Sequence, residues 1–179
     1  MTSYMWLYRT SGCDEPIVLY DYQEGRSGIF AEEFLSGFSG YLPPTRSRIP
    51  TRSRIPTRSR IPMVGGGYHR LEDKGITLCG CWAHARRKFE EALSIMKEKS
   101  PESVAGKGLM YCNRLFKIEE ELKDLSFEEK YNFRQQKSKP IVEEFFEWVE
   151  KQQEQTLPQS LLGKALQYAI NQKKYLLSF

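Results

Sequence analysis

The apolar residues in the first part of the chain predict short strands around one helix. Aromatic and β-branched residues are concentrated in short runs, which is typical of strands. Ser27 is a suitable N-cap for the helix, and Gly40 is a natural stop after it. The predicted elements are strands at residues 4–9, 17–20, 40–42 and 76–79 and a helix over residues 27–38.

From Trp82 onward the apolar residues recur at intervals of three and four, the spacing of amphipathic helices. Pro101 separates the first helix from the second, Glu119 interrupts the apolar stripe of the second, and Pro140 suits the first turn of a later one. The predicted helices cover residues 82–100, 103–125, 127–137, 140–155 and 161–177.

One of these helices has the clearest apolar face in the chain. The face consists of Ile141, Val142, Phe145, Phe146, Trp148 and Val149. We expect it to pack against the other helices, because an amphipathic helix of a globular protein buries its apolar stripe. A surface that docks a partner is the alternative.

A perfect hexapeptide repeat lies between the two patterns. The sequence TRSRIP occupies residues 45–50, 51–56 and 57–62. Each copy offers a single isoleucine, which is too little apolar surface to offset the entropy lost on ordering. Residues 43–66 are therefore expected to form an extended, disordered excursion. Tandem duplication of a short DNA segment is the simpler origin of the array, and a phosphate-binding or docking peptide is the alternative.

The repeat also determines the sign of the net charge, which is +4. Six of the 27 basic residues lie in the repeat, and the remaining 21 stand against 23 acidic residues, a balance of −2. The body of the protein thus gives only weak support to a DNA-binding footprint.

Composition bears on where in the cell the protein is expected. No apolar run approaches the length of a bilayer-spanning helix, so no membrane association is expected. The first residues lack the charged start and apolar stretch of a signal peptide. Four cysteines show no disulfide framework, which favours a reduced, cytoplasmic location.

The densest chemistry lies in residues 80–89, GCWAHARRKF. Cys79, Cys81 and His84 are soft ligands at close spacing and would suit zinc. A fourth ligand of comparable proximity is absent from the sequence, so small buried side chains are the preferred interpretation.

Three consecutive cations, Arg86, Arg87 and Lys88, follow in the same segment. They are candidates for contacts with DNA phosphates. A solvated helix face, with partial pairing to Glu90 and Glu91, explains them equally well.

The segment resembles, almost letter for letter, the Cys-Trp-Ala-His-Ala-Arg-Arg block of the insertion-sequence-66 family of bacterial transposases. Further blocks match that family in the same order, and the resemblance covers nearly the whole chain outside residues 43–66. These blocks are YMWLY at residues 4–8, YDY at 20–22, RSG at 26–28, FLSGFSGYL at 34–42 and ALQYAINQ at 165–172.

The resemblance implies an α+β fold, namely an incomplete ribonuclease-H-like (DDE transposase) core with an all-helical C-terminal insertion. It divides the chain into a partial core (residues 1–42), the excursion (43–66), a core strand and helix (67–100), the helical insertion (101–157) and the start of a final core helix (158–179). The first strand of such a core, at the centre of the sheet, would precede Met1.

The parent activity implied by the family is DNA strand cleavage and transfer, in which three acids hold two Mg²⁺ or Mn²⁺ ions. The first aspartate is expected upstream of Met1 and the glutamate beyond Phe179. The second aspartate would precede the Gly67-Tyr68 pair, where residues 43–66 contain no acid. None of the remaining acids near the core matches the triad: Asp21, Glu24, Glu32, Glu33, Glu72 and Asp73.

We therefore expect a degenerate transposase fragment that is not an enzyme as it stands and binds no cofactor. Cys81, Trp82 and His84 are the candidates for the family's pocket motif, with a structural role here. DNA is the partner of intact relatives and is expected to bind weakly or not at all. The alternative is a non-catalytic protein that binds DNA, or full-length transposase, through the arginine-rich repeat and the helix at residues 86–88.

Overall fold

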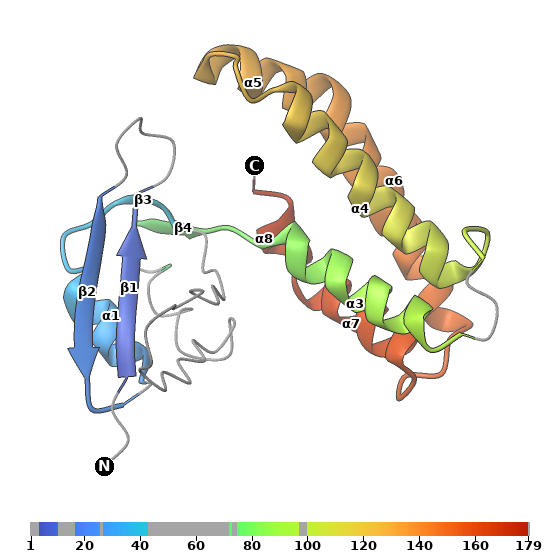
Figure 1. Ribbon diagram of the computed structural model, residues 1–179, viewed down its shortest axis with the longest axis horizontal. Helices are drawn as coiled ribbons and strands as arrows, with labels where there is room; N and C mark the ends of the chain where they lie inside the picture. Colours follow the sequence, from blue (N-terminus) through green and yellow to red (C-terminus); the bar gives the residue numbers. More distant parts are fainter. Residues whose placement is uncertain are drawn as a thin grey trace. The chain divides into compact units, whose positions relative to one another are not determined.

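Figure 1 shows the computed structural model of the chain, which describes residues 4–10, 17–25, 27–42, 72, 75–96 and 100–178. The chain divides into two compact units, Met1–Leu78 and Cys79–Phe179. Strands and a short helix form the described part of the first unit, and helices form the second. The structure is thus a mixture of α and β elements, in agreement with the predicted class. The excursion expected over residues 43–66 lies outside the described residues.

In the first unit, β1 (Tyr4–Arg9) and β2 (Val18–Gln23) form an antiparallel pair. The second strand extends beyond its predicted end at residue 20. Asp21 and Gln23 lie on the same face of this strand, and the Gln23 side-chain amide donates to both Asp21 carboxylate oxygens at 3.1 and 3.0 Å. These bonds stabilise the polar end of the strand. An apolar pattern does not extend to these polar residues, so it could not predict that the strand reaches Gln23.

One face of the β1–β2 pair contacts helix α1 (Gly28–Phe34). The Tyr8 ring stacks on the Phe34 ring with centroids 3.9 Å apart. Trp6 is buried, and its indole N–H donates to the Gly25 carbonyl at 3.4 Å. These contacts explain why the aromatic residues of the first predicted strand alternate with more exposed ones such as Met5.

Helix α1 starts where the sequence predicts, because the Ile29 N–H donates to the Ser27 hydroxyl. Its predicted end near residue 38 is wrong, since the helix stops at Phe34. Gly37 has a φ of +83°, a left-handed conformation that ends helices and that glycine adopts without strain. Gly40 is not the stop but the first residue of the next strand.

Strands β3 (Gly40–Leu42) and β4 (Ile76–Leu78) pair in parallel, with Leu42 opposite Leu78. Ile76 and Leu78 are buried. The order strand, strand, helix, strand, strand, helix is found in the described residues as predicted. The four described strands do not form one sheet, however: they make two sheets of two strands each.

The second unit is helical throughout its described length. The described part of this unit has six helices where five were predicted, because the helix predicted over residues 161–177 is divided in two, and a π-helical segment, η1, joins two of the others. The elements are α3 (Trp82–Ser94), α4 (Val104–Glu121), α5 (Phe127–Phe133), η1 (Arg134–Ser138), α6 (Lys139–Glu154), α7 (Leu161–Asn171) and α8 (Lys173–Leu176).

Serine caps set several helix starts. The hydroxyls of Ser103, Ser126 and Ser160 accept from backbone N–H groups in the first turns of α4, α5 and α7. At Ser126 the cap is reciprocal, because the Glu129 carboxylate accepts from the Ser126 backbone N–H at 2.9 Å.

The predicted break before Pro140 is absent. Residues 127–154 run through α5, η1 and α6 without interruption. The wide turn of η1 closes with a bond from the Lys139 N–H to the Arg134 carbonyl, and Pro140 follows in the first turn of α6. Proline lacks an N–H group, and the first turn of a helix is where that loss costs least. The chain therefore passes the proline without leaving the helix.

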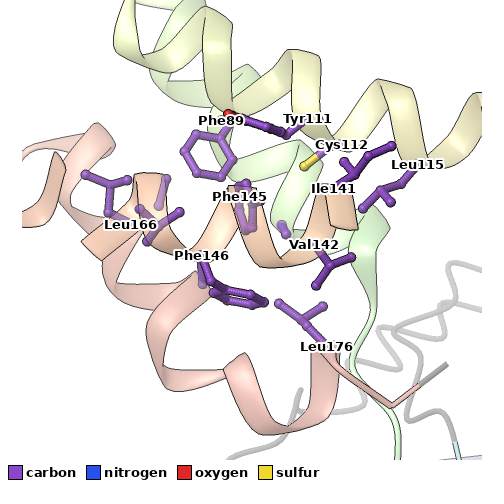
Figure 2. Close-up of a cluster of buried hydrophobic side chains, with 14 residues drawn as sticks. Phe89, Tyr111, Cys112, Leu115, Ile141, Val142, Phe145, Phe146, Leu166 and Leu176 are labelled. Atoms are coloured by element: carbon purple, nitrogen blue, oxygen red, sulfur yellow. The ribbon is translucent and has the colours of Figure 1, made fainter. Parts of the chain in front are cut away.

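The core of the second unit is shared by α3, α4, α6, α7 and α8. Figure 2 shows Phe145 of α6 among side chains from several of these helices. Its ring lies 5.2 Å from Trp82, 5.9 Å from Phe89 and 5.7 Å from Tyr111, all in edge-to-face contacts. The apolar face predicted for residues 141–149 is thus packed against other helices, as expected, with Trp148 only partly buried.

A glycine allows α3 and α4 to approach closely. A Cβ atom added to Gly108 would overlap the Phe89 ring. Gly108 is therefore required by packing in the middle of α4, where glycine is otherwise unfavourable.

Candidate functional site

The motif segment begins at the junction between strand β4 and helix α3. Cys81 is the N-cap of α3, with extended backbone and no side-chain capping bond. Trp82 follows as the first helical residue, and His84 and Ala85 are buried one turn on. The helix starts after the apolar strand β4, with the small residue Cys81 at its N-cap. The spacing of Ala85 and Phe89 explains which face of the helix is buried.

Trp82 ties α3 to the C-terminal helices. Its indole N–H donates to the Leu176 carbonyl at 3.1 Å, across 94 positions of sequence. Two residues earlier, the Gly80 N–H donates to the Tyr175 carbonyl at 2.6 Å. The first half of the motif thus contacts the backbone of α8.

The candidate pocket residues differ in exposure. Cys81 and Trp82 are partly exposed, whereas His84 is 8% exposed and lies within the helical unit. Cys79 is also partly buried, and desolvation raises the pKa of its thiol. A thiol with a raised pKa is a weaker nucleophile and a weaker metal ligand at neutral pH, because both roles need the thiolate.

The zinc alternative finds no support in this geometry. Within the described ranges, no three His, Cys, Asp or Glu side chains are placed so that they could share a metal ion. That holds for the set Cys79, Cys81 and His84 and equally for those acids of the first unit that the structure describes. Asp21 lies on β2, and Glu32 and Glu33 lie on α1.

The three consecutive cations of the motif point away from one another. The Arg86 Nε donates to the Asn113 side chain of α4 at 2.7 Å, and its guanidinium lies 3.8 Å from Glu90. The Lys88 ammonium lies 5.1 Å from the centre of the Tyr168 ring of α7. Arg87, between them, is exposed. Successive helical residues are rotated by about 100°, so the three charges cannot share one face.

Tyr168 is a member of this region that the sequence did not single out. The Lys88 ammonium lies over its ring, and the side chain is partly buried. Burial, followed by the nearby Cys81, raises the pKa of Tyr168 to about 12. The phenol therefore stays protonated at neutral pH. Its only sequence signal is its place within the ALQYAINQ block, where it follows the apolar pair Ala165 and Leu166.

Besides the Arg86–Asn113 bond between α3 and α4, a polar contact joins α4 to α6. The Tyr111 hydroxyl donates to the Glu144 carboxylate at 2.9 Å, and Arg114 lies 3.6 Å from the other oxygen of that carboxylate. Burial and the bond to Glu144 raise the pKa of Tyr111. The group links α4 to α6, and we interpret it as a structural contact.

No helix in the described part of the chain is both long enough and apolar enough to cross a bilayer.

Comparison with known proteins identifies the family. The model of the IS66 transposase family, the DDE_Tnp_IS66 domain, matches residues 1–43 and 66–179 and leaves out the segment that contains the repeat. No solved structure matches the chain.

Three similar proteins come from Sinorhizobium fredii (strain NBRC 101917 / NGR234). Uncharacterized protein y4qI is 26% identical over 99% of this chain and 31% of its own length. Uncharacterized protein y4hP is 38% identical over 43% of this chain and 15% of its own, and uncharacterized protein y4jD is 28% identical over 87% and 27%. The chain spans less than a third of the length of each of these relatives.

The family model covers the first unit on both sides of the repeat and the whole second unit, including the motif segment and the helices that hold it. The chain therefore belongs to the IS66 family of transposases.

Proposed function

We propose that this 179-residue chain is a transposase scaffold without the catalytic chemistry. The proposal has two parts: the first unit belongs to a ribonuclease-H-like core, and the chain cannot assemble the metal-binding acids of such a core. The activity of the family, metal-dependent DNA strand cleavage and transfer, belongs to the intact parent.

The strand pairing supports the first part. An antiparallel pair, β1–β2, and a parallel pair, β3–β4, share no ladder in the described residues. A ribonuclease-H-like sheet has the same two kinds of pair, separated by a central strand. The helix α1 between the pairs contacts β1 through Tyr8 and Phe34, as a helix covering one face of such a sheet would.

The single observation that carries the second part is the scatter of the acids. No three acidic, histidine or cysteine side chains in the described ranges are placed to share an ion. A two-metal mechanism needs carboxylates that hold both ions a few ångströms apart, so that attacking and leaving oxygens are stabilised together. In the first unit, Asp21 lies on β2, whereas Glu32 and Glu33 are neighbours on α1.

The test is a strand-transfer assay with purified chain, Mg²⁺ or Mn²⁺, and DNA that carries the terminal repeats of the element. We expect neither nicking nor joining above a heat-inactivated control, and a longer family member serves as the positive control. Metal-dependent nicking by this chain, lost on addition of EDTA, would show that the proposal is wrong.

The competing hypothesis is a non-catalytic protein that binds DNA or full-length transposase. The arrangement of the motif cations does not favour it, because Arg86 and Lys88 contact groups of their own chain and only Arg87 is exposed. Salt-dependent DNA binding that falls when Arg87 is changed to Ala, or co-purification with tagged full-length transposase, would support this hypothesis.

A further inference from the structure

The last two residues of α8 have few local donors for their carbonyls: the Tyr175 carbonyl accepts from the Ser178 N–H at 3.3 Å, and no backbone N–H within the described residues reaches the Leu176 carbonyl. A helix leaves its last carbonyls without intrahelical donors, and α8 has only four residues, Lys173–Leu176. Such a short helix is not stable alone. Yet Tyr175 and Leu176 are both buried, at 6% and 1% exposure, so their carbonyls have little access to water.

Two donors from the motif segment meet these carbonyls. The Gly80 N–H donates to the Tyr175 carbonyl at 2.6 Å, and the Trp82 indole N–H donates to the Leu176 carbonyl at 3.1 Å. The donors come from the two sides of Cys81, one from backbone and one from a side chain. Together they act on α8 as a C-terminal cap supplied from a distant part of the sequence.

Gly80 is needed for this approach. A Cβ atom at this position would lie 2.8 Å from the Leu176 nitrogen and 2.9 Å from the Tyr175 carbonyl carbon. Both distances are to backbone atoms, which cannot rotate away as a flexible side chain can. Any residue larger than glycine must therefore displace either the motif segment or α8.

Trp82 is held from its other side. Its ring packs edge-on against Phe145 at 5.2 Å and lies 6.3 Å from Phe146, both of α6. Leu176, whose carbonyl receives the indole bond, is itself part of the same hydrophobic core. The indole donor is therefore fixed in direction by the core before it reaches α8.

We propose that Gly80 and Trp82 form a clamp that fixes the C-terminal end of α8 and with it the direction in which the chain continues at Leu177. Gly80 and Trp82 of the motif then serve to position α8 and do not contact DNA. In a longer transposase the clamp would fix the direction of any segment that follows α8, a consequence that rests on the proposed function. The clamp itself does not depend on it.

The test compares two tryptophan-to-phenylalanine variants of the full chain by amide hydrogen exchange. Trp82→Phe keeps an aromatic ring in the core but removes the indole donor. Trp148→Phe is the matched control, since Trp148 belongs to the same aromatic cluster and its indole makes no hydrogen bond within the described residues. We expect the Gly80, Leu176 and Leu177 amides to exchange about fivefold faster in Trp82→Phe, the effect of losing one hydrogen bond.

Amides in the middle of α4, such as that of Leu115, should change equally in both variants. Equal changes at α8 in both variants, or no change at α8 in Trp82→Phe, would overturn the clamp. If Trp82→Phe fails to fold, the same hypothesis is tested on the unmodified chain by hydrogen exchange of the indole protons. The Trp82 indole proton should exchange more slowly than that of Trp148. Gly80→Ala should reproduce the α8 effect. Nicking activity in the strand-transfer assay would refute the proposed function and leave these results unaffected.

Discussion

Arg134 and Glu119 form two parallel hydrogen bonds that join the π-helical segment η1 to α4. The Arg134 Nε lies 2.8 Å from one carboxylate oxygen, and a terminal nitrogen lies 2.6 Å from the other. The hydrogen bond to Glu119 raises the pKa of the Arg134 guanidinium, so the guanidinium keeps its charge in this contact. Glu119, which interrupts the apolar stripe of the second predicted helix, thus joins two helical segments.

Removing this pair should cost a modest amount of stability. The two side chains are 32% and 43% exposed, so solvent screens the pair, and we expect a coupling free energy of about 0.5–1 kcal/mol. A double-mutant cycle with Glu119→Ala and Arg134→Ala, followed by urea unfolding, measures it. The control is Glu120 with Lys123, which are 73% and 67% exposed and should show almost no coupling. Equal coupling in both cycles would contradict the role given to the fork.

Two serines of the continuous segment α5–η1–α6 should show opposite changes in stability when each is replaced by alanine. The Ser138 hydroxyl is buried and has no hydrogen-bond partner within the described residues, so Ser138→Ala should leave stability unchanged or raise it by about 1 kcal/mol. Ser126 caps α5 and exchanges bonds with Glu129, so Ser126→Ala should lower stability by about 1 kcal/mol. Thermal unfolding of both variants is sufficient. A clear loss in Ser138→Ala would show that its hydroxyl has a partner.

Gly108→Ala should destabilise the second unit by about 1–3 kcal/mol through overpacking against Phe89. An exposed helical glycine would show the opposite sign, because alanine favours helix. Adding Phe89→Leu should recover part of the loss, since the smaller side chain leaves room for the new methyl group. Additive effects of the two changes, measured by chemical denaturation, would exclude contact between these positions.

The Cys112 thiol should make the fold less stable at high pH. Burial raises its pKa to about 12 in the folded chain, against a model-peptide value near 9. The unfolded chain therefore loses the thiol proton first. Stability is complete below about pH 9 and falls by about 1.4 kcal/mol per pH unit up to about pH 12.

The Cys112→Ala variant should lose this contribution to the pH dependence. Tyr168, whose pKa is raised from 10.0 to about 12, adds a contribution with the same sign in both proteins. The measurement is the urea midpoint at several pH values from 7 to 11. At pH 8 a thiol reagent should label Cys79 and Cys81, which are partly exposed, well before Cys112. Rapid labelling of Cys112 in the folded chain would contradict its burial.

Much of the architecture could be predicted from the sequence, because local signals decide it. Serine caps mark the starts of α4, α5 and α7, and apolar spacing identifies the buried face of α6. The helix across Pro140 could not be predicted, since proline signals a boundary in sequence and only the wide turn of η1 removes the conflict. The early end of α1 depends on the conformation of Gly37, which competes with an apolar pattern that continues to Phe38.

The candidate site was only partly predictable for a different reason. The residues of the motif were visible, but their partners lie far away in sequence: Leu176 for Trp82, Tyr168 for Lys88, and Asn113 for Arg86. No local pattern links such positions. The divergence of the three cations was within reach, because it follows from the helical rotation between neighbouring residues once α3 is assumed.

The parallel pairing of β3 with β4 has a consequence for how the gene tolerates change. A parallel pair needs a crossover of at least about a dozen residues between its strands. Without the three hexapeptide copies, residues 43–44 and 63–75 would still supply 15. The ladder register between Leu42 and Leu78 therefore does not depend on copy number. Adding or removing whole copies of the six-residue repeat keeps the reading frame and, by this measure, still leaves enough residues for the strand pairing.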